Sequence, residues 1–297
     1  MNNQRILITG GSGLLGRYLR ASKPDGFDIT STRYCNNQDI FSEWRLDITN
    51  ADEIIHVFSL YKPHIVIHTA SMADVDACEK FHDLSDKVNV EGTKNIVAAC
   101  NKFKSTLVFL STNAVFGGRA EGDPPYKEDA IRFPLSEYGV AKKRCEDFIL
   151  NHMNDYLIIR TMWLYGWPYP GGRQNWVTNT INKFNNKEPM RVVDDVTNSP
   201  TYAADVAYAI WELLKKKAQG TYHVAGCEEM SLYDFARKIV DIFDLRGSLS
   251  PCTSDKFPGL AKRPGNTVFD LSKLNAEGIY TRDVNEGLAR MKAYNDI

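Results

Sequence analysis

The stretch ILITGGSGLLG, residues 6–16, decides the fold. An apolar run leads directly into glycines, and a helical pattern, LLGRYLRA, follows them. Gly10, Gly13 and Gly16 are spaced GxxGxxG, while Gly11, Gly13 and Gly16 also satisfy GxGxxG. Without Cβ atoms such a turn lets the backbone approach a diphosphate, and the following helix points free N–H groups at that anion. The stretch therefore predicts a dinucleotide phosphate site, the alternative being only a tight strand–helix turn.

The first part of the chain alternates strand and helix patterns. The apolar strand patterns are residues 5–9, 27–32, 64–70, 106–112 and 156–161. The helical patterns between and after them are residues 14–21, 50–61, 88–103 and 136–153. Apolar strands without polar alternation are buried on both faces, which indicates a parallel sheet covered by helices. We therefore predict an α/β fold with a doubly wound, Rossmann-like parallel sheet.

A smaller second α/β lobe is predicted after about residue 165. The segment YGWPYPGGRQNW, rich in Pro, Gly and aromatic residues, predicts a loop. The patterns after it indicate helices at 177–184, 203–216 and 231–245, strands at 190–195 and 220–226, and then a loop-rich tail. We expect residues 1–165 and 191–226 to form the dinucleotide-binding domain, and residues 166–190 and 227–297 to form the substrate lobe.

Composition excludes several classes of partner. The formal net charge of −1 and the pI of about 6.6 do not favour nucleic acid, and no run of eighteen apolar residues suggests a membrane span. The chain enters a strand within five residues, which leaves no room for a signal peptide. None of the six cysteines forms a CxxC pair, and no acidic or cysteine partner stands at metal-ligand spacing from His64 and His68. We expect a cytoplasmic protein with reduced thiols and no metal, no membrane partner and no nucleic-acid partner.

The second strand bears on cofactor choice. A binder of NAD usually ends this strand with an acid for the ribose 2′-hydroxyl, but here the strand ends Ser31-Thr32-Arg33. Arg33 can pair bidentately with a 2′-phosphate, so we expect NADPH in preference to NADH, unless Arg33 is only a solvated charge. Asp47 can reach an adenine amino group, or it can cap the helix that begins near Asn50.

Three side chains suggest catalysis. Tyr138 and Lys142 lie four apart in SEYGVAKKRCEDF and so share one face of a helix. A lysine cation favours the tyrosinate and lowers the phenol pKa, and such a pair can protonate an alkoxide as hydride arrives. Thr112, at the carboxyl end of a predicted strand, offers a hydroxyl to the same carbonyl. Ligands of open α/β sheets bind outside these strand ends, so the three residues are our candidate catalytic groups.

At these residues the chain resembles the extended short-chain dehydrogenase/reductases, and within them the dTDP-4-dehydrorhamnose reductase family, across nearly its full length. The motifs that carry the resemblance are GGSGLLG, STNAVFGG, PPYKEDAIRFPLSEYGVAKKRCE, RTMWLYG, TNSPTYAADVA, GTYHVAG, SLYDFARKI and KRPGNTVFDLSKL. The early motifs belong to the whole superfamily, and the later ones are more specific to the reductase branch. The resemblance implies NADPH-dependent reduction of a nucleotide-linked 4-keto-6-deoxy sugar, by a homodimer.

The resemblance also implies roles for individual residues. Tyr138 would donate the proton, Lys142 would hold the nicotinamide ribose, and Thr112 would hydrogen-bond the 4-keto oxygen. The expected cofactor-binding residues are Gly10, Gly13, Leu14, Leu15, Arg33, Asp47, Ile48, Ala70, Ser71, Met72, Tyr138 and Lys142. The expected substrate-binding residues are Val115, Phe116, Trp163, Asn175, Trp176 and Arg263.

The chain departs from the family at one motif. Where the family commonly shows STDYVFDG, this chain has Asn113, Ala114 and Gly117 in place of Asp, Tyr and Asp. The loss of the aromatic side chain at Ala114 reshapes the pocket beside the ketone. Two alternatives therefore stay open: a nucleotide-sugar epimerase on the same scaffold, and a non-catalytic NADP-binding subunit such as the regulatory subunit of methionine adenosyltransferase. An Asp-Glu pair typical of the sugar dehydratases is missing after Thr112, which disfavours dehydration.

Overall fold

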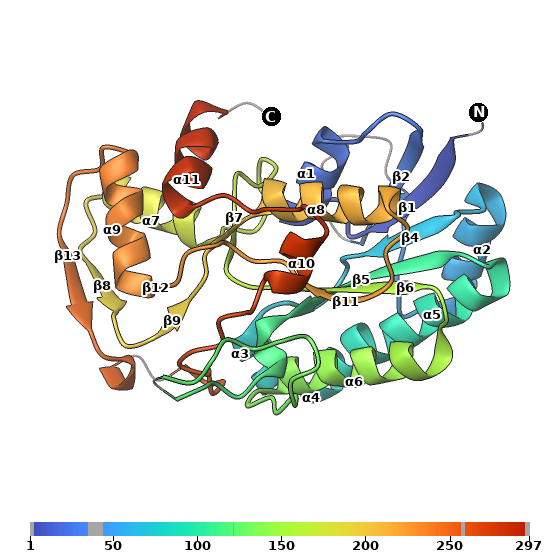
Figure 1. Ribbon diagram of the computed structural model, residues 1–297, viewed down its shortest axis with the longest axis horizontal. Helices are drawn as coiled ribbons and strands as arrows, with labels where there is room; N and C mark the ends of the chain where they lie inside the picture. The colour runs from blue at the N-terminus through green and yellow to red at the C-terminus, as the bar shows by residue number, and fades with distance from the viewer. Residues whose placement is uncertain (1–2, 35–43, 121, 257–258, 295–297) are drawn as a thin grey trace.

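The computed structural model describes residues 3–34, 44–120, 122–256 and 259–294. Its centre is a parallel sheet in which, among these residues, seven strands lie in the order β3-β2-β1-β4-β5-β6-β11 (Figure 1). The strands are β1 Gln4–Thr9, β2 Phe27–Arg33, β3 Trp44–Arg45, β4 Ile65–His68, β5 Thr106–Thr112, β6 Tyr156–Thr161 and β11 Gly220–His223. The strand order reverses direction at β1 and β4, which is the doubly wound arrangement. The predicted fold class is confirmed.

Both faces of the sheet are buried, as the apolar strands predict. Ile6 and Ile8 of β1 belong to one core, and Leu7 between them belongs to the other. Figure 1 shows α1 and α8 on one side of the sheet and α2, α5 and α6 on the opposite side. These helices are α1 Leu14–Ala21, α2 Ala51–Tyr61, α5 Gly92–Phe103, α6 Glu137–His152 and α8 Ala203–Lys215. Alternate side chains of one strand thus anchor helices on opposite faces.

The helix predicted at 88–103 begins earlier and is irregular. After α3, Val75–Lys80, the chain forms α4, His82–Ser85, and then a π-helical turn, η1, Asp86–Glu91, before α5. A π turn adds a residue to the helical repeat and so shifts the apolar periodicity on which the prediction rests. Such turns are frequent at functional sites, and this one carries Asn89.

The second lobe is built around a short parallel strand pair. β8, Met190–Val193, pairs with β13, Leu249–Cys252, and α7, Trp176–Asn185, and α9, Leu232–Ile242, pack beside it. The core there consists of Phe184, Met190, Val192 and Ala236. β8 thus pairs outside the central sheet, although the predicted dinucleotide-binding range 191–226 includes most of it. The division of the chain into two lobes stays a prediction.

The prediction of a loop-rich tail is wrong for two segments, which form α10, Ser272–Ala276, and α11, Val284–Ala293. In α11 the buried residues Val284, Leu288 and Met291 follow helical spacing and join the core that contains α8. The remaining short elements are η2 Asn113–Val115, β7 Leu164–Tyr165, β9 Thr197–Asn198, β10 Thr201–Tyr202, β12 Met230–Ser231 and η3 Ser254–Lys256. β7 pairs with β10, and β9 pairs with β12.

Three findings bear on membranes, metals and thiols. None of the helices in the described ranges combines the length and the apolar character needed to cross a membrane. Over the same residues no cluster of three or more His, Cys, Asp or Glu side chains is arranged to hold a metal ion. Cys78, Cys100, Cys145, Cys227 and Cys252 are free thiols, and Cys35 lies outside the described residues.

Candidate active site

The structure brings the three predicted catalytic residues to the carboxyl end of β5. Thr112 is the last residue of this strand, and Tyr138 and Lys142 lie in the first turns of α6. Ser136 caps α6 by accepting a hydrogen bond from the Gly139 N–H at 3.3 Å. A Cβ atom at Gly139 would lie 2.2 Å from the Ala114 carbonyl oxygen, so the missing side chain lets α6 approach the turn after β5. This approach sets Tyr138 beside Thr112.

Lys142 is held below the tyrosine ring. Its side chain is buried, and its Nζ donates a hydrogen bond to the Leu110 carbonyl at 2.8 Å. The same atom lies 4.6 Å from the centre of the Phe109 ring and 5.9 Å from the centre of the Tyr138 ring. The ammonium is therefore fixed by β5, one helical turn from the phenol that it was predicted to assist.

Burial governs the pKa values of this pair. It raises the pKa of the Tyr138 phenol well above the usual 10, and a hydrogen bond with Thr112 opposes the rise. Burial lowers the pKa of the Lys142 ammonium, against the influence of Cys145, Glu146 and Cys78. Burial thus acts against the lowering of the phenol pKa that the sequence analysis expects, and at neutral pH the phenol carries its proton.

A buried ion-pair network supports α6 behind the site. Glu146, one turn beyond Lys142, is fully buried and accepts hydrogen bonds from Arg160 at 2.7 and 2.9 Å and from Arg132 at 2.8 Å. The Ser111 hydroxyl, next to Thr112, donates to the same carboxylate at 2.5 Å. These contacts join α6, β5 and β6. The sequence analysis did not single them out, because the partners are distant along the chain.

The glycine turn lies against the end of β4. Gly10 has a φ of +72°, which favours glycine, and a Cβ atom there would lie 2.8 Å from the Ala70 nitrogen. Gly13 stands at the N-cap of α1, and a Cβ atom at Gly16 would lie 2.4 Å from the Gly11 carbonyl oxygen. The three glycines thus make a close backbone turn at the N-terminus of α1, as a phosphate cradle requires. Leu14 begins α1, and Leu15 is buried in the core.

Ala70, Ser71 and Met72 follow β4 beside this turn, and Asn89 holds them in place. The Asn89 side chain accepts from the Met72 N–H at 2.8 Å and donates to the Met72 carbonyl at 3.0 Å. Sequence reasoning missed Asn89. The available signal was a polar residue placed between two valines, Val88 and Val90.

The residues predicted near the adenine end lie at the ends of β2 and β3. Arg33 is half-buried at the end of β2. Asp47 accepts from the Thr49 N–H at 2.9 Å, while the cap of α2 is Asn50, so the alternative role of Asp47 as that cap is wrong. Ile48 is buried, and its carbonyl accepts from the Asn95 side chain at 3.2 Å.

The predicted substrate residues fall into two groups. Val115 and Phe116 are fully buried in a core cluster with Met162, Ala225 and Phe269, and Phe116 stacks on Tyr126. Trp163 is half-buried and has a φ of +40°, a strained conformation for a bulky residue. Such strain persists where the surroundings impose it, and it clusters at functional sites. The substrate-binding roles of all three stay predictions.

Asn175, Trp176 and Arg263 already have partners in the structure or a place in its core. Asn175 caps α7 and donates from its side chain to the Gly166 carbonyl at 2.6 Å. Trp176 packs against two core clusters, and its buried indole nitrogen has no hydrogen-bond partner among the residues that the structure describes. Arg263 pairs with Asp76 of α3 at 2.7 Å.

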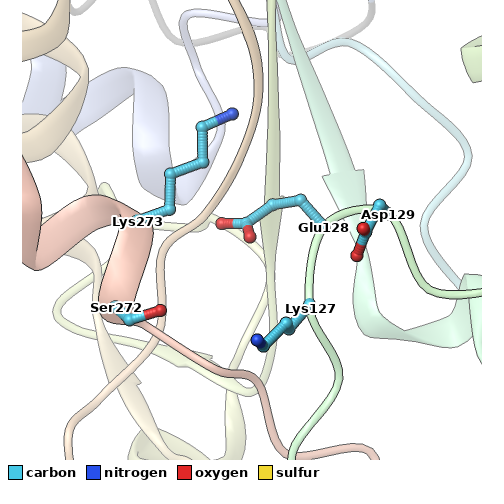
Figure 2. Close-up of a pocket in the computed structure, with 5 residues that line it drawn as sticks. All are labelled: Lys127, Glu128, Asp129, Ser272 and Lys273. Carbon is cyan, nitrogen blue, oxygen red and sulfur yellow. The ribbon is translucent and has the colours of Figure 1, made fainter.

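A pocket of about 420 Å³ lies apart from the catalytic residues. Figure 2 shows Lys127, Glu128 and Asp129 on one loop, facing Ser272 and Lys273 of α10. This pocket borders the edge strand β11: the Glu128 carboxylate accepts from the His223 N–H at 3.0 Å, and Lys273 donates to the Thr221 carbonyl at 2.7 Å. It contains none of the predicted site residues.

Comparison with known proteins identifies the family. The family model described as RmlD substrate binding domain matches residues 4–295. The chain is 33% identical to dTDP-4-dehydrorhamnose reductase of Aggregatibacter actinomycetemcomitans, over 98% of this chain and 99% of that protein. It is 30% identical to methionine adenosyltransferase 2 subunit beta of Bos taurus, over 94% and 84% of the two chains. A crystal structure of dTDP-4-dehydrorhamnose reductase from Bacillus anthracis in complex with NADP superposes with a TM-score of 0.87, at 32% identity and over 98% and 99% of the two chains. With the glycine turn, the strand order and the Tyr-Lys helix all in place, the chain belongs to the RmlD substrate binding domain family.

Proposed function

We propose that this chain reduces the 4-keto group of a nucleotide-linked 6-deoxy sugar with NADPH, as a dTDP-4-dehydrorhamnose reductase does. The observation that carries the proposal is the meeting of Thr112, Tyr138 and Lys142 at the carboxyl end of β5. The names of the relatives from Aggregatibacter and Bacillus, and the NADP in the latter structure, agree with it.

The residues present fit a dinucleotide. The turn at Gly10 leaves a backbone cradle that a Cβ atom would fill, and α1 begins immediately after it. Gly10, Gly13 and the α1 N-terminus would hold the diphosphate, and Arg33 would hold the 2′-phosphate. The bound cofactor supplies the hydride.

The chain's own residues supply the proton and the orientation. With an ordinary pKa near 10 that burial raises further, Tyr138 holds its proton at neutral pH, and an alkoxide formed from the ketone is basic enough to take it. Lys142 is fixed to β5 through the Leu110 carbonyl, and its charge favours the tyrosinate that remains after the transfer. Glu146, bonded to Ser111 of β5 and to Arg160 of β6, keeps α6 against the sheet, so both groups retain their positions.

A spectrophotometric assay tests the proposal. The full chain is mixed with NADPH and dTDP-4-keto-L-rhamnose, and the absorbance of the reduced cofactor is followed. We expect the cofactor to be consumed, and faster with NADPH than with NADH. If neither this ketosugar nor its GDP and UDP counterparts cause consumption, the proposal is wrong.

The relative named methionine adenosyltransferase 2 subunit beta makes a non-catalytic binding role the second candidate. That role predicts binding of NADPH, measured by titration calorimetry, without oxidation by any ketosugar. An epimerase instead predicts protein that is purified with NAD and does not consume added NADPH.

Three further expectations accompany the proposal. We propose that the enzyme is cytoplasmic, that it forms a homodimer, and that residues 166–190 and 227–297 form the lobe that binds the sugar nucleotide. Light scattering after size-exclusion chromatography tests the dimer. Fluorescent tagging in cells of the source organism tests the location.

A further inference from the structure

A segment of the second lobe, residues 265–269, reaches the catalytic strand end. It is fixed on both sides by backbone hydrogen bonds: the Thr197 N–H donates to the Gly265 carbonyl at 2.8 Å, and the Tyr126 N–H donates to the Val268 carbonyl at 2.9 Å. Thr267 in this segment is fully buried. Its side chain faces Asn113, the residue that directly follows Thr112.

The Thr267 backbone fixes which groups donate and which accept in this set of hydrogen bonds. The Thr267 N–H donates to Asn198 Oδ1 at 3.2 Å, and the Thr267 hydroxyl donates to the same oxygen at 2.6 Å. A backbone N–H can only donate, so the amide oxygen of Asn198, not its NH₂ group, must face Thr267. Asn198 is itself buried.

Asn113 must then present its NH₂ group to the second lobe. Its Nδ2 lies 2.6 Å from Thr267 Oγ1 and 3.4 Å from Asn198 Oδ1. The Thr267 proton is already directed at Asn198, so both of these oxygens are acceptors. The amide oxygen of Asn113 is therefore left to face Thr112.

This orientation decides what the Thr112 hydroxyl can do. It donates to Asn113 Oδ1 at 3.2 Å and accepts from the Ala114 N–H at 3.1 Å. A hydroxyl has one proton to donate, and in this structure that proton is donated to Asn113 Oδ1. Asn113 thus fixes the direction in which the Thr112 hydroxyl points.

We propose that Asn113 is a positioning residue that links the seating of segment 265–269 to the direction of the Thr112 hydroxyl, whose proton its amide oxygen accepts. The inference rests on the proposed function and deepens it.

The residue type at position 113 follows from the same network. The aspartate common in the family could still accept from Thr112, but a carboxylate has no proton for Thr267 Oγ1 or Asn198 Oδ1. Asparagine can bond to both, because its amide oxygen accepts from Thr112 and its NH₂ group donates to Thr267 and Asn198. The asparagine at position 113 is thus complementary to the two acceptor oxygens of Asn198 and Thr267.

Steady-state kinetics of four variants in the full chain test the proposal. Asn113→Asp keeps the acceptor for Thr112 and loses the donor to Thr267, so we expect KM for the nucleotide ketosugar to rise about tenfold while kcat stays within about threefold. Thr267→Val should raise KM similarly, and the double variant should be no worse than Asn113→Asp alone. Asn113→Leu loses both the acceptor for Thr112 and the donor to Thr267, so kcat should also fall, by about tenfold.

Thr180→Val is the matched control, because Thr180 is equally buried but its hydroxyl bonds only to the Trp176 carbonyl of its own helix. It should leave both constants unchanged. Equal losses of kcat in Asn113→Asp and Asn113→Leu, or additive effects of Asn113→Asp and Thr267→Val, would overturn the proposal, since those results describe a merely structural residue.

Hydrogen exchange separates this inference from the proposed function. The Thr267 amide should exchange at least about tenfold faster in Asn113→Asp than in wild type, and not in Thr180→Val. This measurement needs no turnover. If the wild type reduces no ketosugar but the exchange changes as expected, the proposed function fails and the link between Asn113 and segment 265–269 stands. Unchanged exchange overturns the link whatever the activity.

Discussion

Tyr138 and Lys142 respond to burial in opposite directions. Burial disfavours the charged form of each group, so the phenol keeps its proton at neutral pH and the ammonium loses its proton more readily than a solvated lysine. A phenol that is protonated and close to a lysine is prepared for the reductive direction, in which it gives up a proton. The charge of Lys142 matters most after that transfer, when it faces a tyrosinate.

Tyr138→Phe should lower kcat by at least about 100-fold, because it removes the proton donor and leaves the ring in place. Binding of NADPH, followed by fluorescence, should change less than about threefold, since the diphosphate cradle is untouched. Tyr280→Phe is the control, because the Tyr280 side chain is exposed. A Tyr138→Phe enzyme with near-normal kcat would remove Tyr138 from the mechanism.

His68 gives the stability of the fold a pH dependence. It is buried between Thr9 and Thr93, and burial, with Lys142 nearby, lowers its pKa to about 3. Between that value and the usual 6.5, the unfolded chain takes up a proton that the folded chain refuses. The stability from this group is therefore complete above pH 6.5 and falls as the pH drops, by about 1.4 kcal/mol per pH unit.

Urea unfolding at pH 7.5 and pH 5.0 measures this effect. His68→Gln should reduce the difference in free energy of unfolding between the two pH values, whereas His56→Gln, at an exposed position, should leave it unchanged. The buried His223, whose pKa is also lowered to about 3, contributes the dependence that remains. An unaltered difference in His68→Gln would show that His68 is protonated in the folded chain.

At the scale of elements, the contact between α6 and the η2 turn sets the site. Gly139 lets the two backbones meet, and Ser136 fixes where α6 begins. The relative position of α6 and the end of β5 is thereby set by backbone packing and not by contacts between the side chains of the site. The position of Tyr138 relative to Thr112 is a property of this packing.

Gly139→Ala should separate α6 from η2, because the new methyl group would lie 2.2 Å from the Ala114 oxygen and 2.9 Å from Pro134 Cβ. We expect a loss of about 1–3 kcal/mol in the free energy of unfolding, measured by urea denaturation, and a lower kcat. Gly265→Ala, a position with no other atom within 4 Å of the added carbon, should cost much less stability. Equal losses in the two variants would contradict the packing argument.

Elements that depend on local pattern were predictable, and those that depend on distant partners were not. β5 and β6 occupy the predicted ranges 106–112 and 156–161, because an apolar run between polar segments fixes both ends. The two-residue strands β9 and β12 have no pattern of their own and exist only through their pairing. α11 did carry apolar residues at helical spacing, and only its charged neighbours obscured them.

The residues of the candidate site also separate into those that local spacing reveals and those that depend on distant partners. Tyr138 and Lys142 were found because four residues make one helical turn, and the glycine turn because its spacing is local. The pairing of Asn113 with Thr267 joins residues 154 positions apart, and no spacing rule encodes it. The roles predicted for individual cofactor and substrate residues stay predictions.

At the scale of the whole molecule, side chains tie the second-lobe segments to the sheet domain. Arg282 forms an ion pair with Asp205 at the start of α8, and its N–H donates to the same carboxylate at 3.0 Å. Asp205 is buried, and burial raises its pKa although Arg282 opposes the rise. The carboxylate therefore depends on its arginine.

Arg282→Gln should lower the free energy of unfolding by about 3 kcal/mol, because it leaves the Asp205 carboxylate buried without a counter-ion. The double variant Arg282→Gln/Asp205→Asn should recover part of that loss in urea denaturation, since the unpaired charge is then gone. Arg290→Gln, which breaks only an exposed pair with Glu286, should cost less than about 1 kcal/mol. A double variant less stable than Arg282→Gln alone would refute this account.

The side chains on β11 have a consequence for how copies of this protein can associate. Two backbone groups on the outer side of this strand are occupied, the His223 N–H by Glu128 and the Thr221 carbonyl by Lys273. An incoming strand would have to displace both charged side chains before it could extend the sheet. Sheet-to-sheet polymerisation through β11 is thereby blocked, and assembly at this end of the molecule is left to side-chain surfaces rather than to backbone pairing.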